Sequence, residues 1–162
     1  MSAEQRLEHL ARTMGVEGLA FNADGCARLT FDGRIALNLE SDPVAGRLHL
    51  YVELGALPAR GRETVYRALL EGNLFGAQTG EATLAVDAAA DAVVLCRTLW
   101  AEEVSAAAFT EIVQAMVGCA NVWQQALADG TLGGTEPAAG SAATTESFEP
   151  WRRADRDPMM QV

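Results

Sequence analysis

The sequence predicts an α+β fold with the element order α-β-β-β-α-β-β-α, a five-stranded twisted antiparallel sheet combined with three helices. Three successive segments between residues 27 and 54 alternate apolar and polar side chains, which is typical of antiparallel strands with one buried face. Helical segments precede and follow this group, and two further strands lead into a last helix. Strands grouped in series, with helices between the groups, favour an α+β layer structure over a parallel sheet.

The first helix is expected over residues 2–14, with Ser2 as its cap and Gln5 at the capping-box position. One apolar stripe runs along it, formed by Leu7, Leu10, Ala11 and Met14. Strands are then expected over residues 27–31, 34–40 and 47–54. Asp32-Gly33 between the first two is a two-residue hairpin signal.

The segment from Tyr66 to Asp87, YRALLEGNLFGAQTGEATLAVD, is the one around which the rest is organised. It begins as the second helix, whose end is marked by Gly72 and Gly76, and it continues into a strand from about Ala82. The segment is too apolar for a solvated connector. We therefore expect it to be covered by the rest of a small sheet or by a second copy of the chain.

The fifth strand is expected over residues 93–100, VVLCRTLW, which are apolar on both faces over much of their length. This pattern suits a central strand or one that contacts a partner. Ser105 then caps a long third helix that runs to about Leu127. The folded domain is predicted to span residues 1–128.

Residues 129–162 are rich in Gly, Ala, Ser, Thr, Glu and Pro and have no apolar period, so they are interpreted as a flexible tail. Phe148 and Trp151 stand beside Arg152 and Arg153 there. A short docking motif is one interpretation of this cluster. A solvated tail with two isolated aromatic side chains is the favoured one.

The net charge of −10 and the pI near 4.6 argue against nucleic acid and against anionic membranes as partners. No apolar run is long enough to span a membrane, and the N-terminus lacks the apolar core of a secretory signal. The cysteines Cys26, Cys96 and Cys119 are far apart and odd in number. They indicate buried, reduced thiols in a cytosolic protein rather than a disulfide framework.

The residue types that carry catalysis or bind metals do not form a recognisable pattern. His9 and His49 have no Cys, Asp or His at ligand spacing, and the cysteines form no CxxC motif. The glycines of the central segment lack the lysine and preceding strand of a phosphate-binding loop. We therefore predict no catalytic, metal-binding or cofactor-binding residue, no cofactor and no enzymatic activity.

The second helix carries more apolar surface than one side of a sheet usually covers. A thick core would explain this, but a homodimer in which the second helix and fourth strand meet their symmetry mates is the favoured interpretation.

The element order, the segment LLEGNLFGAQTGEATLAVD and the following VVLCRTLW resemble the class I type III secretion chaperones, the CesT or Tir-chaperone family. The resemblance extends over about Ser2 to Leu127. It is most specific where Asn73, Leu74 and Phe75 lead into a Gly-bounded apolar strand.

The resemblance implies a cytoplasmic bacterial homodimer that binds the N-terminal chaperone-binding segment of one or more secreted effector proteins. The client is held in extended form, stays secretion-competent and is handed to the export apparatus, with the secretion ATPase or sorting platform as a further partner.

Two surfaces follow from this resemblance as hypotheses. The dimer contacts are expected from the second helix and fourth strand, namely Val65, Leu69, Phe75, Leu84 and Val86. The effector-binding grooves are expected from the first helix, the first strands and the fifth strand, namely Leu7, Leu10, Met14, Leu29, Phe31, Leu37, Val94, Cys96 and Trp100. Some of these residues must be ordinary core, and the sequence does not sort the two faces.

Two alternative functions remain open at this point. The first is a chaperone-like adaptor for a non-secreted cytosolic partner. The second is a small-molecule-binding α+β protein, which would need a deep pocket with convergent polar groups around His49, Glu53 or Cys96.

Overall fold

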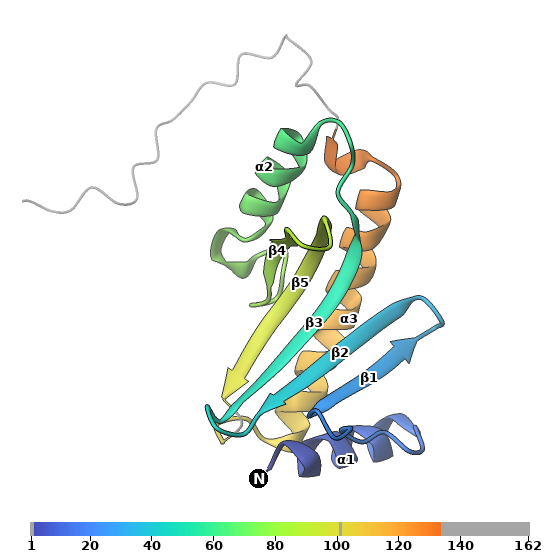
Figure 1. The fold of residues 1–162 in the computed structure, drawn as a ribbon, viewed down its shortest axis with the longest axis vertical. Coiled ribbons are helices and arrows are strands. Elements are labelled where there is room, and N and C mark those ends of the chain that lie inside the picture. The colour runs from blue at the N-terminus through green and yellow to red at the C-terminus, as the bar shows by residue number, and fades with distance from the viewer. Residues whose placement is uncertain (1, 101, 134–162) are drawn as a thin grey trace, which may run out of the picture.

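The predicted element order is confirmed in the computed structural model, which describes residues 2–100 and 102–133 (Figure 1). In chain order the elements are α1 (Ala3–Met14), β1 (Cys26–Phe31), β2 (Ile35–Asp42), β3 (Arg47–Ala56), α2 (Arg62–Gly72), the one-turn helix η1 (Leu74–Gly76), β4 (Thr83–Asp87), β5 (Ala92–Trp100), α3 (Ala106–Ala128) and the one-turn helix η2 (Thr131–Gly133).

The five strands form one antiparallel sheet in the order β1-β2-β3-β5-β4, so β1 and β4 are its edges. The predicted hairpin turn between β1 and β2 is confirmed: Asp32 and Gly33 have φ values of 50° and 64°. Positive φ at both central residues is the type I′ geometry, whose twist matches that of paired strands.

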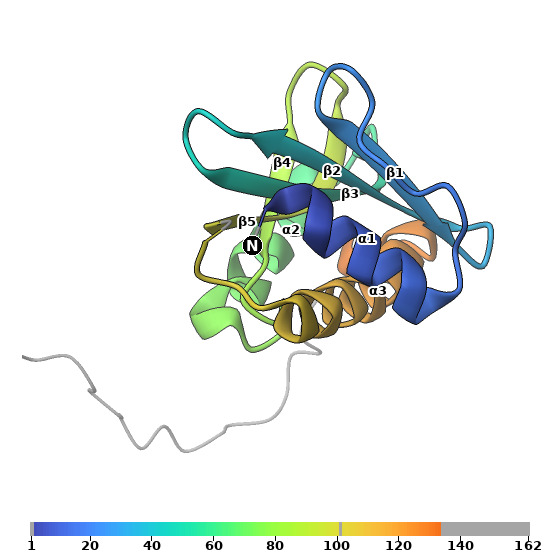
Figure 2. The same ribbon diagram turned by 90° about the horizontal axis from the view of Figure 1, so that it is seen from below.

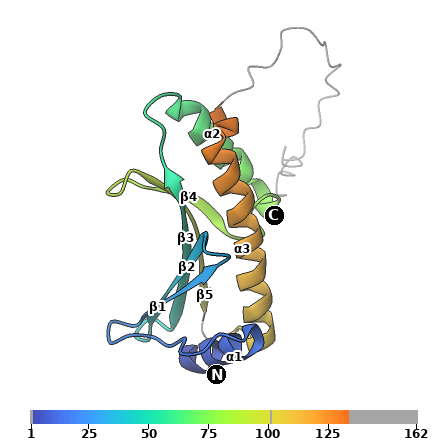
Figure 3. The same cartoon turned by 90° about the vertical axis from the view of Figure 1, so that its right-hand side faces the viewer.

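The three helices all lie on one side of the sheet, which leaves the other face uncovered (Figures 2 and 3). Alternation along each strand places one set of side chains under the helices. Leu37, Leu50 and Val52 of the sheet are fully buried there together with Phe109 and Val113 of α3. Within the described residues no helix is both long and apolar enough to cross a membrane.

Helix α1 begins as predicted, because Ser2 and Gln5 form a reciprocal capping box. Arg6, which the apolar stripe did not include, is only 1% exposed. Its Nε donates a hydrogen bond of 2.7 Å to the carbonyl of Val104, and its Nη1 donates to the carbonyl of Ser2. The arginine thus ties α1 to the segment that leads into α3.

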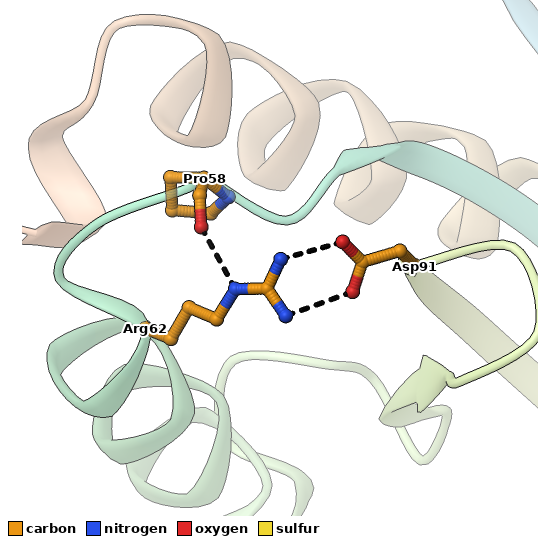
Figure 4. A network of polar contacts seen from close by, with 3 residues as sticks. All are labelled: Pro58, Arg62 and Asp91. Carbon is orange, nitrogen blue, oxygen red and sulfur yellow. Dashed lines mark hydrogen bonds and ion pairs between the residues drawn. The ribbon is translucent and has the colours of Figure 1, made fainter.

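Helix α2 is fixed at both ends. At its start, Nη1 and Nη2 of Arg62 donate hydrogen bonds to the two carboxylate oxygens of Asp91, and Nε of Arg62 donates to the carbonyl of Pro58 (Figure 4). At its end, an added Cβ on Gly72 would lie 2.4 Å from the Trp123 ring. The glycine leaves room for this side chain of α3 against the end of α2.

Helix α3 ends at Ala128, and η2 then lies against α2 and α3. The predicted flexible tail over residues 129–162 therefore begins with a short helical turn. Its remainder, residues 134–162, lies outside the described residues.

Candidate interaction surfaces

The chemically reactive side chains are few, and the structure separates them. No three His, Cys, Asp or Glu side chains within the described ranges gather into a possible metal site. Nδ1 of His49 lies 2.9 Å from Oγ1 of Thr98 on the uncovered face of the sheet. Burial raises the pKa of the Cys96 and Cys119 thiols, which lowers the fraction present as reactive thiolate.

Large apolar side chains are exposed on three consecutive elements, α2, η1 and β4. We call this set the α2–β4 surface; it consists of Tyr66, Leu70, Leu74, Phe75 and Val86. Leu70 is 72% exposed and Phe75 is 97% exposed. Several large apolar side chains presented by consecutive elements are typical of a protein–protein contact site.

Phe75 is held outward by a strained backbone. Its φ of 55° and ψ of 18° interrupt η1 and lie in the left-handed region, which a bulky side chain rarely adopts. Such a conformation costs about 1–3 kcal/mol and is found where function requires it. Because the ring is almost fully exposed, contacts within the protomer do not offset this strain.

Asn73 joins this surface to the sheet edge. Its side-chain amide accepts a 2.8 Å hydrogen bond from the Leu84 N–H and donates a 3.0 Å bond to the Leu84 carbonyl. The backbone N–H and C=O groups of Leu84 therefore point away from β5. Because these groups alternate in direction along an antiparallel strand, those of Val86 also point away from β5 and lie at the open edge of β4.

The opposite edge of the sheet is capped in the same way. The Cys26 N–H donates a 2.8 Å bond to Oδ1 of Asn22, and the Cys26 carbonyl accepts a 2.8 Å bond from the Asn22 N–H. Alternation along β1 then turns the backbone groups of Arg28 and Thr30 outward. Each edge strand thus has one residue capped by an asparagine and further residues open to pairing.

The structure divides the predicted dimer contacts into two groups. Val65, Leu69 and Leu84 are buried in the protomer core, at 2%, 4% and 4% exposure. They support the α2–β4 surface from below and present little surface of their own. Phe75 and Val86 are exposed on it, so these two remain as candidate contacts.

The predicted effector-binding residues are likewise divided. Four lie in the core beneath the sheet and cannot line an open groove: Leu7, Leu10, Leu29 and Leu37. Met14 and Phe31 are partly buried against that core. Val94, Cys96 and Trp100 alternate with the buried side chains of β5 and therefore share the uncovered face. These nine residues do not form one groove.

A hollow of about 330 Å³ lies on the uncovered face, next to the β4 edge. Its apolar lining consists of the small side chains of Ala85 and Ala92 together with Val94 and Cys96. Its polar lining comes from Asn38, Tyr51, Glu53 and Asp87. An apolar side chain with a neighbouring cation would fit such a site.

Polar contacts hold the uncovered face in shape around the hollow. The Tyr51 hydroxyl donates a 2.8 Å bond to Oε1 of Glu40, and this bond, helped by burial, raises the pKa of Tyr51 to about 12. The Arg47 guanidinium lies 4.9 Å from the centre of the Trp100 ring. Trp100 is nevertheless 51% exposed and available to a partner.

A comparison with protein-family models identifies the chain. The model described as the Tir chaperone protein (CesT) family matches residues 5–124, most of the sequence. The chain belongs to this family. The matched region contains both edge strands, the α2–β4 surface and the hollow of the uncovered face. No curated protein matches the sequence.

Solved structures with the CesT-family fold include chaperone complexes. The ExsC–ExsE complex contains a chain with 20% identity and a TM-score of 0.64, covering 77% of this chain and 96% of that one. The HopA1–SchA chaperone–effector complex contains a chain with 17% identity and a TM-score of 0.62, covering 75% of this chain and 91% of that one. The Yersinia pestis type III secretion chaperone SycH, in complex with a stable fragment of YscM2, has 23% identity and a TM-score of 0.59, covering 74% of this chain and 98% of that one. At these identities the likeness shows a shared fold.

Sequence reasoning missed three features of this CesT-family chain. The asparagine caps at Asn22 and Asn73 were not predicted, although an asparagine before a strand is a signal for such bonds. The strained Phe75 was predicted only as an apolar contact. The hollow of the uncovered face is lined by residues of β2, β3, β4 and β5, and a local sequence pattern cannot predict which residues of separate strands come together.

Proposed function

We propose that this chain is a class I type III secretion chaperone whose homodimer binds the N-terminal chaperone-binding segment of one or more effector proteins. The client is held in extended form in the bacterial cytoplasm, and it stays soluble and secretion-competent until the export apparatus receives it. The family match over residues 5–124 is the observation that carries this proposal. The similar HopA1–SchA chaperone–effector complex and the similar type III secretion chaperone SycH support it, and the secretion ATPase or sorting platform would be the receiving partner.

Client binding uses the open edge of β1 and the uncovered face of the sheet. Arg28 and Thr30 offer outward backbone groups, to which an extended segment can add a strand. Each backbone hydrogen bond contributes only about 1 kcal/mol net. Ordering the client costs at least about 2–5 kcal/mol, so backbone pairing at so short an edge is not sufficient.

Apolar anchors supply the remaining affinity. A fully buried client side chain contributes about 1.5–3 kcal/mol, and the hollow beside Val94 and Cys96 can accept one. Trp100 offers a second contact on the same face. A client that pairs with β1 and then crosses the uncovered face reaches both sites. The acidic Glu53 and Asp87 at the hollow favour a basic residue next to the anchor.

Dimerisation uses the α2–β4 surface in an isologous contact. Phe75 and Val86 are the predicted contact residues that are exposed, and Leu70 and Leu74 extend the surface. Burial of Phe75 against a second copy would offset the strain of its backbone. The dimer then leaves the β1 edge free for the client, and the hollow of the uncovered face, which Val86 also lines, lies at the border of the dimer contact.

The test is co-expression of the chain with N-terminal segments of candidate effectors, followed by copurification and limited proteolysis without nucleotide. We expect a short effector segment to be retained and protected. Ala85→Trp, which fills the hollow, should weaken retention, whereas Val44→Trp on the exposed β2–β3 turn should not. Retention of a folded cytosolic partner without a protected N-terminal segment would instead support the adaptor function.

A further inference from the structure

A second apolar groove lies on the helical side of the molecule, away from the uncovered face. It has a volume of about 440 Å³ and is formed by the C-terminal half of α3, the loop after η1 and η2. Its principal lining residues are Gln78, Cys119, Val122, Trp123, Ala126 and Leu132. Val122 is 65% exposed, so the groove is open in the described part of the chain.

The polar groups at the base of this groove already have partners. The Gln78 carbonyl accepts a 3.0 Å bond from Nε1 of Trp123 and a 3.3 Å bond from Sγ of Cys119. What the groove offers to a ligand is therefore mainly apolar surface. An occupant with large apolar or aromatic side chains and little need for polar contacts fits it best.

We propose that this groove binds the chain's own C-terminal segment at Phe148 and Trp151. The described chain ends at Gly133, directly after Leu132, which lines the groove. Fourteen residues separate Gly133 from Phe148, and a flexible chain of that length spans about 20 Å on average. The two aromatic side chains can therefore return to the groove from which their segment departs.

Tethering favours this occupant over a second copy of the chain. A short flexible linker gives an effective concentration of about 1 mM, and a second copy at micromolar concentration has to compete with it. An adjoining hollow shares Trp123 and Leu132 and continues past Arg67 and Glu71, which form an ion pair with each other.

A docked tail segment would bury the apolar surface of this groove. The inference concerns an intramolecular contact, so it does not depend on which client the chaperone binds or on whether the chain dimerises.

The native Cys119 is a reporter of this groove, and Cys96 on the opposite face is its control. We would measure the alkylation rate of each thiol by mass spectrometry in the full chain and in a Phe148→Ser/Trp151→Ser variant. With an effective concentration of about 1 mM and a segment affinity of about 0.1 mM, docking slows alkylation of Cys119 about tenfold. The double variant should lose this protection while the Cys96 rate stays unchanged.

A second measurement uses the tail segment in trans. A peptide of residues 145–155 should restore protection of Cys119 in the double variant, and the same peptide with both aromatics replaced by serine should not. Equal Cys119 rates in the full chain and the double variant would overturn the proposal. Protection that rises with protein concentration and survives the double substitution would also overturn it, because it would assign the groove to a second copy.

Discussion

Phe75→Gly separates the stability of the protomer from that of the dimer. The wild-type ring is 97% exposed in the protomer, so its removal loses almost no internal packing. Glycine also adopts the left-handed φ of 55° without strain. Relief of about 1–3 kcal/mol of strain, set against about 0.5–1 kcal/mol of added chain entropy, predicts an unchanged or more stable protomer.

The dimer should respond in the opposite direction. A fully buried phenylalanine contributes about 1.5–3 kcal/mol, and an isologous interface contains two copies, so the loss is about 3–6 kcal/mol. At 1.4 kcal/mol for each factor of ten, the dimer Kd should rise about 10²- to 10⁴-fold.

Sedimentation velocity over a wide concentration range gives the dimer Kd, and urea unfolding of the dissociated protein gives the protomer stability. Val44→Gly is the matched control, since Val44 is 98% exposed on the turn between β2 and β3. An unchanged dimer Kd in Phe75→Gly would refute the placement of this residue in the interface. A wild-type chain that stays monomeric at every concentration would refute the dimer itself.

Three further predictions concern the protomer. Asn73→Ala removes both hydrogen bonds to the β4 edge and should lower the free energy of unfolding in urea by about 2 kcal/mol. Gly72→Ala should lower it by about 1–3 kcal/mol through the clash with the α3 indole, whereas Gly118→Ala, with nothing within 4 Å, should raise it by about 0.5–1 kcal/mol. Because the folded-state pKa of Tyr51 is raised to about 12, the contribution of Tyr51 to stability should be present below pH ~10 and lost as pH rises to about 12. Absorbance titration of a Glu40→Gln variant should show a smaller upward shift of the Tyr51 pKa.

The sequence predicted the elements well because their signals are local. Alternation fixed the three N-terminal strands, and Asp32-Gly33 fixed the turn between two of them. The capping box at Ser2 and Gln5 fixed the start of α1. Each of these signals depends on residues a few positions apart, so no knowledge of the tertiary structure was needed. The burial of Arg6 was not predicted, because it depends on a hydrogen bond to Val104, which is distant in sequence.

The candidate sites were less predictable because apolarity alone does not distinguish a core from an interface. Leu69 and Leu70 are neighbours in one helix, yet they are 4% and 72% exposed. The difference depends on the direction in which α2 docks on the sheet. Contacts distant in sequence hold α2 in place, namely the Arg62–Asp91 bond and the Trp123 side chain of α3 beside Gly72. Neither contact is visible as a local pattern.

The two sheet edges differ in a way that suits two kinds of partner. An asparagine caps one residue of each edge strand, which shortens the stretch open to uncontrolled pairing. The open part of β4 adjoins the exposed apolar side chains of α2 and η1, and permanent interfaces are enriched in such surface. The open part of β1 carries Arg28 and Thr30, which a weaker and exchangeable contact tolerates. The proposed chaperone would have to keep its second subunit while releasing its client, and this division of the edges would serve both contacts.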